Sequence, residues 1–378
     1  MVRIFISAGE PSGVAIGAML MRELKKRIPD VTFKGFGGPP MVDEGLEVIF
    51  DPAKTAAMWL FGNLKRIPEH RRALKTAQQS WRDEPPDLVI TIDYQAFHLY
   101  LGTFARKMGL KVMHFVGSQF WGRKIYTLNP IRRAYSHVLL IHEFEKKHYD
   151  AAGIPSTFVG HPLFERIQMR NLEPDKVATM KSHPGPRIAV LPGSRGGEIS
   201  HSLPIMLGSV RRLQPRPYML LSCARQESRA YLEDALANSD LEGELYDYDS
   251  GEILLAADLA VMTSGSITME AVYYGCPGVV VYRVHPFSYF FARPLVAGYI
   301  AQPNIIAGRE IVPEFLLGHD DIDGVGGALQ HLLTSESSRD LQKAEFKKLK
   351  DHLLDAPTPT KEAARVAVEL IGENGAGT

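Results

Sequence analysis

Short apolar runs alternate with stretches of helical periodicity along this 378-residue chain, and this alternation limits the fold more than any other feature. Strand–helix alternation of this kind is typical of parallel sheets with helices on both faces. In the first half, the apolar runs predict strands at residues 3–7, 32–35, 88–93, 111–116, 137–141 and within 153–162. A second series begins later in the chain, with predicted strands at residues 187–191, 218–222, 259–262 and 278–282. The sequence therefore predicts an α/β protein.

The two series predict two doubly wound, Rossmann-like domains, since the chain is longer than one ordinary domain. We expect the first domain at residues 1–165, the second at 166–355, and a C-terminal helix and tail at 356–378. That helix is amphipathic and is expected to pack back across the domain interface. Parallel sheets bind ligands at the carboxyl ends of their strands, so the expected active site is a cleft between the domains.

Charge and cysteine content narrow the class of protein. The formal net charge is zero, which argues against a nucleic-acid partner bound through a globally basic surface. Residues 1–170 hold 24 Lys and Arg against 16 Asp and Glu, a balance that suits a phosphate or an acidic membrane surface. Ordinary scatter of surface charge explains this asymmetry equally well. Cys223 and Cys276 form no metal or disulfide motif, which fits a reducing cytoplasm. The longest apolar runs fall short of about 18 residues, so we expect a protein that is soluble or lies on a membrane without crossing it.

Two glycine-containing loops follow predicted strands and open helices. The first holds Gly9, Glu10, Ser12 and Gly13, where backbone amides are able to approach a ligand, although a tight turn explains the glycines as well. Its spacing differs from the dinucleotide-binding fingerprint, so no nicotinamide cofactor is predicted.

The second glycine-containing loop is more specific. Gly193, Ser194 and Arg195 follow the strand at residues 187–191. Such a loop is able to hold a pyrophosphate on its amides while the guanidinium adds charge, and a turn capped by Ser194 is the alternative.

A third loop places hydroxyl groups at a helix N-terminus. Ser264, Gly265 and Ser266 follow the strand at residues 259–262, where free amides and the helix dipole favour an anion. Glu270 lies one turn further and suits a ribose hydroxyl. An N-cap explains the two serines alone. The acidic residues 320–323 fit a solvated loop and helix cap, so no metal site and no cofactor are predicted.

Asp93 ends the strand at residues 88–93 and has two interpretations. A carboxylate at this position faces the expected cleft and is able to act as a general base. It is also able to cap the following helix, and position alone slightly favours the cap.

An apolar cluster precedes a basic stretch in the first half. Met58, Trp59, Leu60 and Phe61 come before several Lys and Arg residues between positions 65 and 75. An exposed cluster of this kind fits a peripheral membrane contact, whereas a buried core stripe beside a solvated helix fits equally well.

Six segments together resemble the lipid-A-disaccharide synthase family in order and spacing: residues 7–13, 86–93, 158–161, 191–198, 264–270 and 302–310. The resemblance implies the GT-B fold and an inverting glycosyltransferase. The implied reaction joins UDP-2,3-diacylglucosamine to 2,3-diacylglucosamine 1-phosphate, giving lipid A disaccharide 1-phosphate and UDP. It also implies roles for Asp93 as base, for Arg195 and for Asn304, and a protein that binds the cytoplasmic surface of the inner membrane. A homodimer is compatible with the sequence.

Three departures from the family pattern all fall in the first domain. Val14 stands where the family has Asp, residues 95–98 are Gln-Ala-Phe-His in place of Pro-Asp-Phe-Asn, and residues 117–123 differ from a Ser-Pro-Ser-x-Trp-Ala-Trp run. These changes lie on the expected acceptor side. One alternative is therefore a diverged GT-B transferase with a UDP-sugar donor and a different lipid or small-molecule acceptor. A silent protein that senses nucleotide-sugar or lipid is another.

Overall fold

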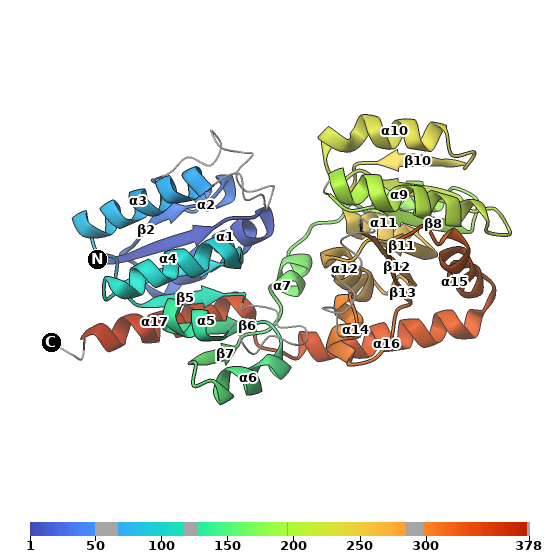
Figure 1. The fold of residues 1–378 in the computed structure, drawn as a ribbon. Helices are drawn as coiled ribbons and strands as arrows, with labels where there is room; N and C mark the ends of the chain where they lie inside the picture. Colours follow the sequence, from blue (N-terminus) through green and yellow to red (C-terminus); the bar gives the residue numbers. More distant parts are fainter. Residues whose placement is uncertain (50–66, 117–127, 195, 285–297, 376–378) are drawn as a thin grey trace. The chain divides into compact units, whose positions relative to one another are not determined.

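The computed structural model describes residues 1–49, 67–116, 128–194, 196–284 and 298–375, which form two compact units (Figure 1). The first unit contains the described residues up to position 166 together with those from position 356 onward, and the second contains residues 167–355. The chain therefore returns to the first unit after completing the second.

A parallel sheet forms the centre of the first unit. Its strands follow the order β3-β2-β1-β4-β5-β6-β7. Ala8 at the end of β1 pairs with Ile92 at the end of β4, so the loops after these two strands begin side by side. The strands are β1 (Val2–Ala8), β2 (Val31–Phe36), β3 (Leu46–Val48), β4 (Leu88–Ile92), β5 (Val112–Phe115), β6 (His137–Leu140) and β7 (Ser156–Phe158).

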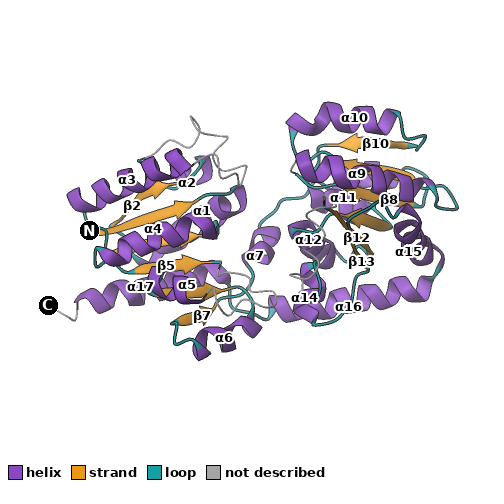
Figure 2. Ribbon diagram, viewed as in Figure 1, coloured by secondary structure: helices purple, strands orange, loops and turns teal. Residues whose placement is uncertain are grey.

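Helices cover both faces of this sheet (Figure 2). They are α1 (Pro11–Arg27), α2 (Pro39–Asp43), α3 (Ile67–Asp83), α4 (Gln95–Lys107), α5 (Leu128–Ala134), a short 3-10 helix (Glu143–Glu145), α6 (Lys146–Ala151), α7 (Pro162–Gln168, at the unit boundary) and α17 (Pro359–Gly375). Because side chains alternate along a strand, Ile4 and Ile6 meet the core under α1 and α17, while Phe5 meets Trp81 of α3 with ring centroids 5.1 Å apart.

The second unit repeats the architecture with a parallel sheet ordered β10-β9-β8-β11-β12-β13. Its strands are β8 (Arg187–Leu191), β9 (Tyr218–Ser222), β10 (Gly243–Tyr246), β11 (Leu259–Met262), β12 (Gly278–Arg283) and β13 (Glu314–Leu317). Its helices are α8 (Pro174–Lys181), α9 (Gly196–Arg211), a 3-10 helix (Gln226–Ser228), α10 (Arg229–Ala237), α11 (Ser250–Ala256), α12 (Ser266–Tyr274), α14 (Gln302–Ala307), α15 (Ile322–Thr334) and α16 (Glu336–Leu354). The parallel α/β class predicted from the sequence is confirmed.

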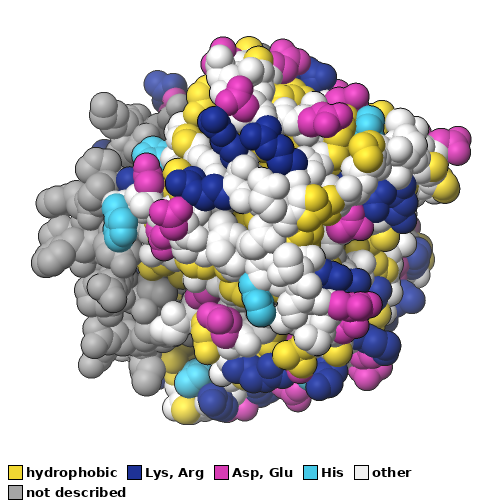
Figure 3. All heavy atoms as spheres, turned by 90° about the vertical axis from the view of Figure 1, so that its right-hand side faces the viewer, with side chains coloured by type: hydrophobic (Ala, Val, Ile, Leu, Met, Phe, Trp, Pro, Cys, Tyr) yellow, Lys and Arg dark blue, Asp and Glu magenta, His cyan; other side chains and the backbone are white. Residues whose placement is uncertain are grey.

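The surface of the molecule in Figure 3 carries basic and acidic side chains interspersed with small apolar areas. No large area of one charge sign is visible on the described part of that face.

Candidate active site

Asp93 lies directly after β4 in a backbone conformation that residues other than glycine rarely adopt. Its φ is 54°, and that of the following Tyr94 is 43°. Each such residue costs on the order of 1–2 kcal/mol, so the surrounding structure has to hold the turn. The Asp93 N–H donates to the carbonyl of Phe115 on β5 at 2.9 Å, which fixes the end of the strand.

His98 on α4 contacts the backbone of the same turn. Its Nδ1 lies 2.6 Å from the carbonyl oxygen of Asp93, and its Nε2 lies 2.8 Å from the hydroxyl of Ser7. A carbonyl only accepts, so Nδ1 carries the proton and Nε2 accepts from Ser7. Burial lowers the pKa of His98 to about 4, so the ring is neutral near pH 7. A buried, uncharged side chain therefore links the end of β1 to the turn that carries Asp93.

The first glycine-containing loop lies beside this turn. A Cβ at Gly13 would be 3.4 Å from the carbonyl oxygen of Ile92, the residue before Asp93. Gly9, Glu10 and Ser12 belong to the same connection, which ends β1 and opens α1. The structure thus brings the predicted acceptor loop and the predicted base to one edge of the first sheet.

At the corresponding edge of the second sheet, the two predicted donor loops meet. Leu191 at the end of β8 pairs with Met262 at the end of β11. Gly193 has a φ of +95°, and a Cβ there would lie 2.9 Å from Cγ2 of Thr263, so both conformation and close approach require glycine. Ser194 follows it and is half-buried, while Arg195 lies outside the described residues.

The N-terminus of α12 forms the open part of this edge. Ser264 donates its hydroxyl to the carbonyl of Ile300 at 2.8 Å, which ties the loop to the segment before α14. A Cβ at Gly265 would meet nothing within 4 Å, and Ser266 begins the helix with its side chain exposed. Free amides at a helix start favour an anion, so this position suits a phosphate group.

Glu270 lies inside a charged cluster that sequence reasoning missed. Arg170 binds both of its carboxylate oxygens, at 2.7 and 2.9 Å, and Ser250 donates to the same carboxylate. Burial is the largest single influence and opposes the charge of Arg170, but the hydrogen bond to Glu270 and the charges of Glu270 and Asp249 together outweigh it, so the pKa of the guanidinium is raised. Arg170 also contacts Asp249 at 2.9 Å. The connector after α7 is thereby bound to the start of α11 and the middle of α12.

Asn304 on α14 is fully buried and organises a neighbouring loop. Its Nδ2 donates to the carbonyl of Val312 at 2.7 Å and to Glu314 at 2.9 Å. Its Oδ1 accepts from the backbone N–H groups of Ile311 and Val312. Glu314 in turn accepts from the backbone of Ile300 and Ala301. The Asn304 side chain therefore fixes the segment that Ser264 contacts.

The predicted membrane-contact residues Met58, Trp59, Leu60 and Phe61 lie outside the described residues. Within the described ranges, no helix combines the length and apolar character needed to cross a bilayer. In the same ranges, no cluster of three or more His, Cys, Asp or Glu side chains is arranged to hold a metal ion.

The sequence is similar to one family over nearly its whole length. The family model described as Lipid-A-disaccharide synthetase matches residues 4–368. The lipid-A-disaccharide synthase of Pseudomonas putida KT2440 is 35% identical over 340 residues, which cover 89% of this chain and 91% of that protein. The lipid-A-disaccharide synthase of Pseudomonas fluorescens Pf0-1 is 34% identical and covers 98% of this chain and 99% of its own length.

Solved structures share the fold of this chain. The calicheamicin glycosyltransferase CalG4 has a TM-score of 0.61 at 14% identity and covers 99% of each chain. HepE of Anabaena, solved with UDP and glucose, has a TM-score of 0.58 at 13% identity and covers 98% of this chain and 100% of its own. At such low identity the likeness shows the fold alone. The fold is GT-B, as the sequence predicts.

Proposed function

This chain belongs to the lipid-A-disaccharide synthase family of hexosyltransferases, and on that premise we propose that it joins UDP-2,3-diacylglucosamine to 2,3-diacylglucosamine 1-phosphate. The products are lipid A disaccharide 1-phosphate and UDP. The observation that carries the proposal is the meeting of the Gly193 and Ser264 loops at one edge of the second sheet. Related folds solved with UDP support a nucleotide-sugar donor.

On the acceptor side, Asp93 removes the proton from the 6-hydroxyl of the sugar. The oxygen then attacks the anomeric carbon of the donor, the bond from that carbon to the diphosphate breaks, and the configuration inverts. A positioned carboxylate in this role typically contributes a factor of about 100 to 10,000 in rate. The neutral Ser7–His98 pair keeps Asp93 at the strand end without adding a competing charge.

On the donor side, the UDP leaving group carries the negative charge that develops. Amides around Gly193, Ser194, Gly265 and Ser266 bind the diphosphate, and Arg195 adds a permanent positive charge. Glu270 is assigned to the ribose. Its carboxylate accepts hydrogen bonds from Arg170 and Ser250, and its remaining lone pairs accept from the ribose hydroxyls. Asn304 acts at the same edge by fixing the segment at residues 300–301.

We assign residues 1–165 to the acceptor, residues 166–355 to the donor, and residues 356–378 to a helix and tail that support the first domain. Met58, Trp59, Leu60 and Phe61 are proposed to contact the inner membrane from its cytoplasmic side. Self-association into a homodimer is compatible with this arrangement.

Substitution of the two chemical groups tests the mechanism. Asp93→Asn and Arg195→Ala should each lower turnover by about 100-fold or more, with the unfolding transition unchanged. Asp43→Asn and Arg216→Ala change the same residue types at exposed positions and should stay within about twofold of the parent. Near-parental turnover in the Asp93 or Arg195 variant would exclude the assigned role.

One observation favours a second candidate, a diverged GT-B transferase with another acceptor. His98, at one of the positions where this chain departs from the family pattern, bonds directly to the backbone of Asp93. Measuring UDP release with and without 2,3-diacylglucosamine 1-phosphate distinguishes the candidates. Release that depends on this lipid supports the first candidate, and release only with another acceptor supports the second. No release with any acceptor supports a silent binding protein.

A further inference from the structure

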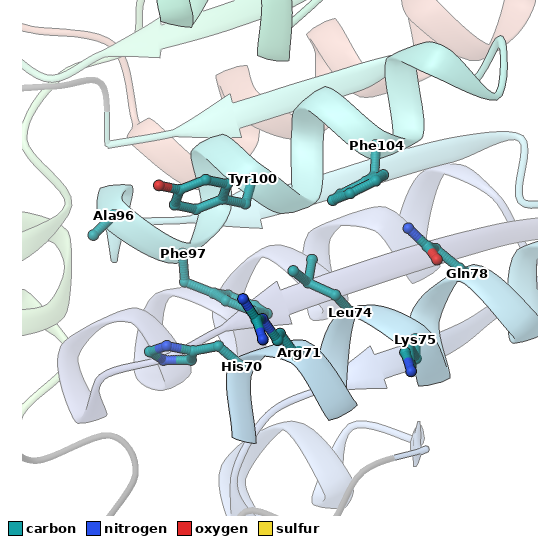
Figure 4. A pocket seen from close by; sticks show the side chains of 9 residues that line it. All are labelled: His70, Arg71, Leu74, Lys75, Gln78, Ala96, Phe97, Tyr100 and Phe104. Atoms are coloured by element: carbon teal, nitrogen blue, oxygen red, sulfur yellow. The ribbon is translucent and has the colours of Figure 1, made fainter. Parts of the chain in front are cut away.

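A cavity of about 610 Å³ lies between α3 and α4 in the first unit (Figure 4). Its lining comes from residues spaced three or four apart on each helix, so one face of each helix forms one wall. Leu74 lines the α3 side, and Phe97, Tyr100 and Phe104 line the α4 side. A cavity of this size is typical of a small-molecule site.

The α4 side of the cavity is apolar and only partly covered. Phe97 is 3% exposed and forms the floor with the ring of His70, the two ring centroids lying 5.3 Å apart. Tyr100 is 67% exposed and Phe104 37% exposed, which is unusual for large rings that line one cavity. Exposed aromatic groups gathered along a groove mark a binding surface for an apolar ligand.

The charged groups of the lining are of one sign. Arg71 and Lys75 stand one turn apart on α3, and the lining contains no acidic side chain. The groove therefore suits a molecule with an apolar chain and a negative group beside it.

The position of the groove in the first unit indicates which molecule it binds. Helices that connect parallel strands run back from the carboxyl edge of the sheet, so His70 and Phe97 lie at that edge and Gln78 and Phe104 lie below it. The ring of Phe97 lies 6.1 Å from that of Tyr94, the residue after Asp93, so this end of the groove lies near the turn that carries the proposed base. It then extends about 12 Å along the helices, from the rise of eight residues.

We propose that this groove binds an acyl chain of the glycolipid acceptor and sets which chain lengths the protein accepts. The inference rests on the proposed function and adds the element that recognises the lipid part of the substrate. In 2,3-diacylglucosamine 1-phosphate the 2-acyl group neighbours the phosphate on the sugar ring. Arg71 and Lys75 match that phosphate while the chain lies along Leu74, Tyr100 and Phe104.

Acceptors that differ only in chain length test the proposal. Turnover is measured with tetradecanoyl and hexanoyl forms of 2,3-diacylglucosamine 1-phosphate. Leu74→Trp fills the groove and should lower kcat/KM for the long-chain acceptor by about tenfold or more, because each methylene kept out of an apolar site costs about fourfold in binding. The short-chain acceptor should change by less than about threefold and serves as the internal control for folding.

A second variant keeps the proposal testable if Leu74→Trp does not fold. Phe104→Ala deepens the groove and should shift preference toward a hexadecanoyl acceptor. Arg71→Ala should raise the KM for the phosphorylated acceptor by about tenfold, whereas Arg82→Ala, exposed on the same helix outside the groove, should stay within about twofold. An equal loss with both chain lengths, or no change with either, overturns the proposal.

Two further measurements separate the alternatives. Binding of Leu74→Trp to phosphatidylglycerol vesicles should match the parent, and loss of vesicle binding together with equal loss for both acceptors would make the groove a membrane contact instead. If the parent protein turns over neither acceptor, the proposed function fails, and a Tyr100→Cys variant still tests the groove. Cys223 and Cys276 are buried, so maleimide labelling reports on the new thiol. The long-chain lipid alone should protect this thiol, and equal labelling with the long-chain and the short-chain lipid overturns the inference.

Discussion

The carboxyl edges of the two sheets share a topology but satisfy their buried polar groups with different chemistry. In the first unit, His98 and His114 bond the hydroxyls of Ser7 and Thr91, and burial keeps both rings neutral. In the second unit, Arg170 and Glu270 form an ion pair with a distance of 2.7 Å between Nη1 and Oε2. A neutral network is vulnerable to protonation, whereas an ion pair is vulnerable to loss of one partner.

Acidification should give the largest effect and should act on the first unit. Burial lowers the pKa of four histidines there: His98 and His161 to about 4, His114 to about 3 and His142 to about 2. Between pH 6.5 and about 4 the unfolded chain binds more protons than the folded one, so the free energy of unfolding falls as pH falls. We expect a loss of several kcal/mol over this range, since each pKa unit is worth about 1.4 kcal/mol.

Glu145 opposes this trend in its own window. Burial raises its pKa to about 8, so between pH 4.5 and 8 the folded state holds more protons and its contribution weakens as pH rises. One carboxyl acts against four imidazoles, and the histidines dominate. Pulse proteolysis at pH 7 and pH 5, with the fragments assigned to each unit, checks the prediction. If the second unit is cleaved at a lower denaturant concentration than the first at pH 5, the prediction is wrong.

Removal of one partner should give the next largest effect, in the second unit. Arg170→Ala leaves the carboxylate of Glu270, only 4% exposed, without its bidentate partner. We expect a loss of about 3–5 kcal/mol in urea unfolding. The double variant Arg170→Ala, Glu270→Gln should recover part of this loss, because it removes the buried charge as well. No recovery would mean that packing, and not charge, stabilises the cluster.

Asn304→Ala removes an uncharged buried side chain of the second unit, and its effect can be compared with the loss of the charged Arg170. The change leaves the N–H groups of Ile311 and Val312 without their acceptor, at a cost of about 1–3 kcal/mol. Asn238→Ala, at an exposed helix end, should change stability by less than about 0.5 kcal/mol. Equal effects at the two positions in urea unfolding would contradict the role given to Asn304.

Ser7→Ala should give the smallest effect. It removes one hydrogen bond to His98 and should cost about 1 kcal/mol. The Nδ1 proton should remain on His98, since the carbonyl of Asp93 still accepts it, and the nitrogen shifts of the ring in NMR spectra report this directly. A switch to the other tautomer would show that Ser7, and not Asp93, sets the state of the ring.

The central strands were predictable from the sequence because they are buried on both faces. Residues 187–191 and 218–222 match β8 and β9, whereas the edge strands β10 and β13 were missed because they are short and half-exposed. The GT-B fold and the hexosyltransferase family follow from motifs that keep their spacing. The sequence does not reveal the contact of His98 with Ser7 or that of Arg170 with Glu270, because the two residues of each pair lie 91 and 100 positions apart along the chain.

The position of α17 links the first half of the protein to the order of its synthesis. Ala363, Ala367 and Leu370 pack into the same core as Ile4 and Ile6, and the carbonyl of Leu370 accepts a hydrogen bond from Lys111. This core therefore stays incomplete until the ribosome has made the chain as far as residue 370. The first unit stays partly uncovered while residues 167–355 are translated, and termination before α17 should expose its core to proteases and chaperones.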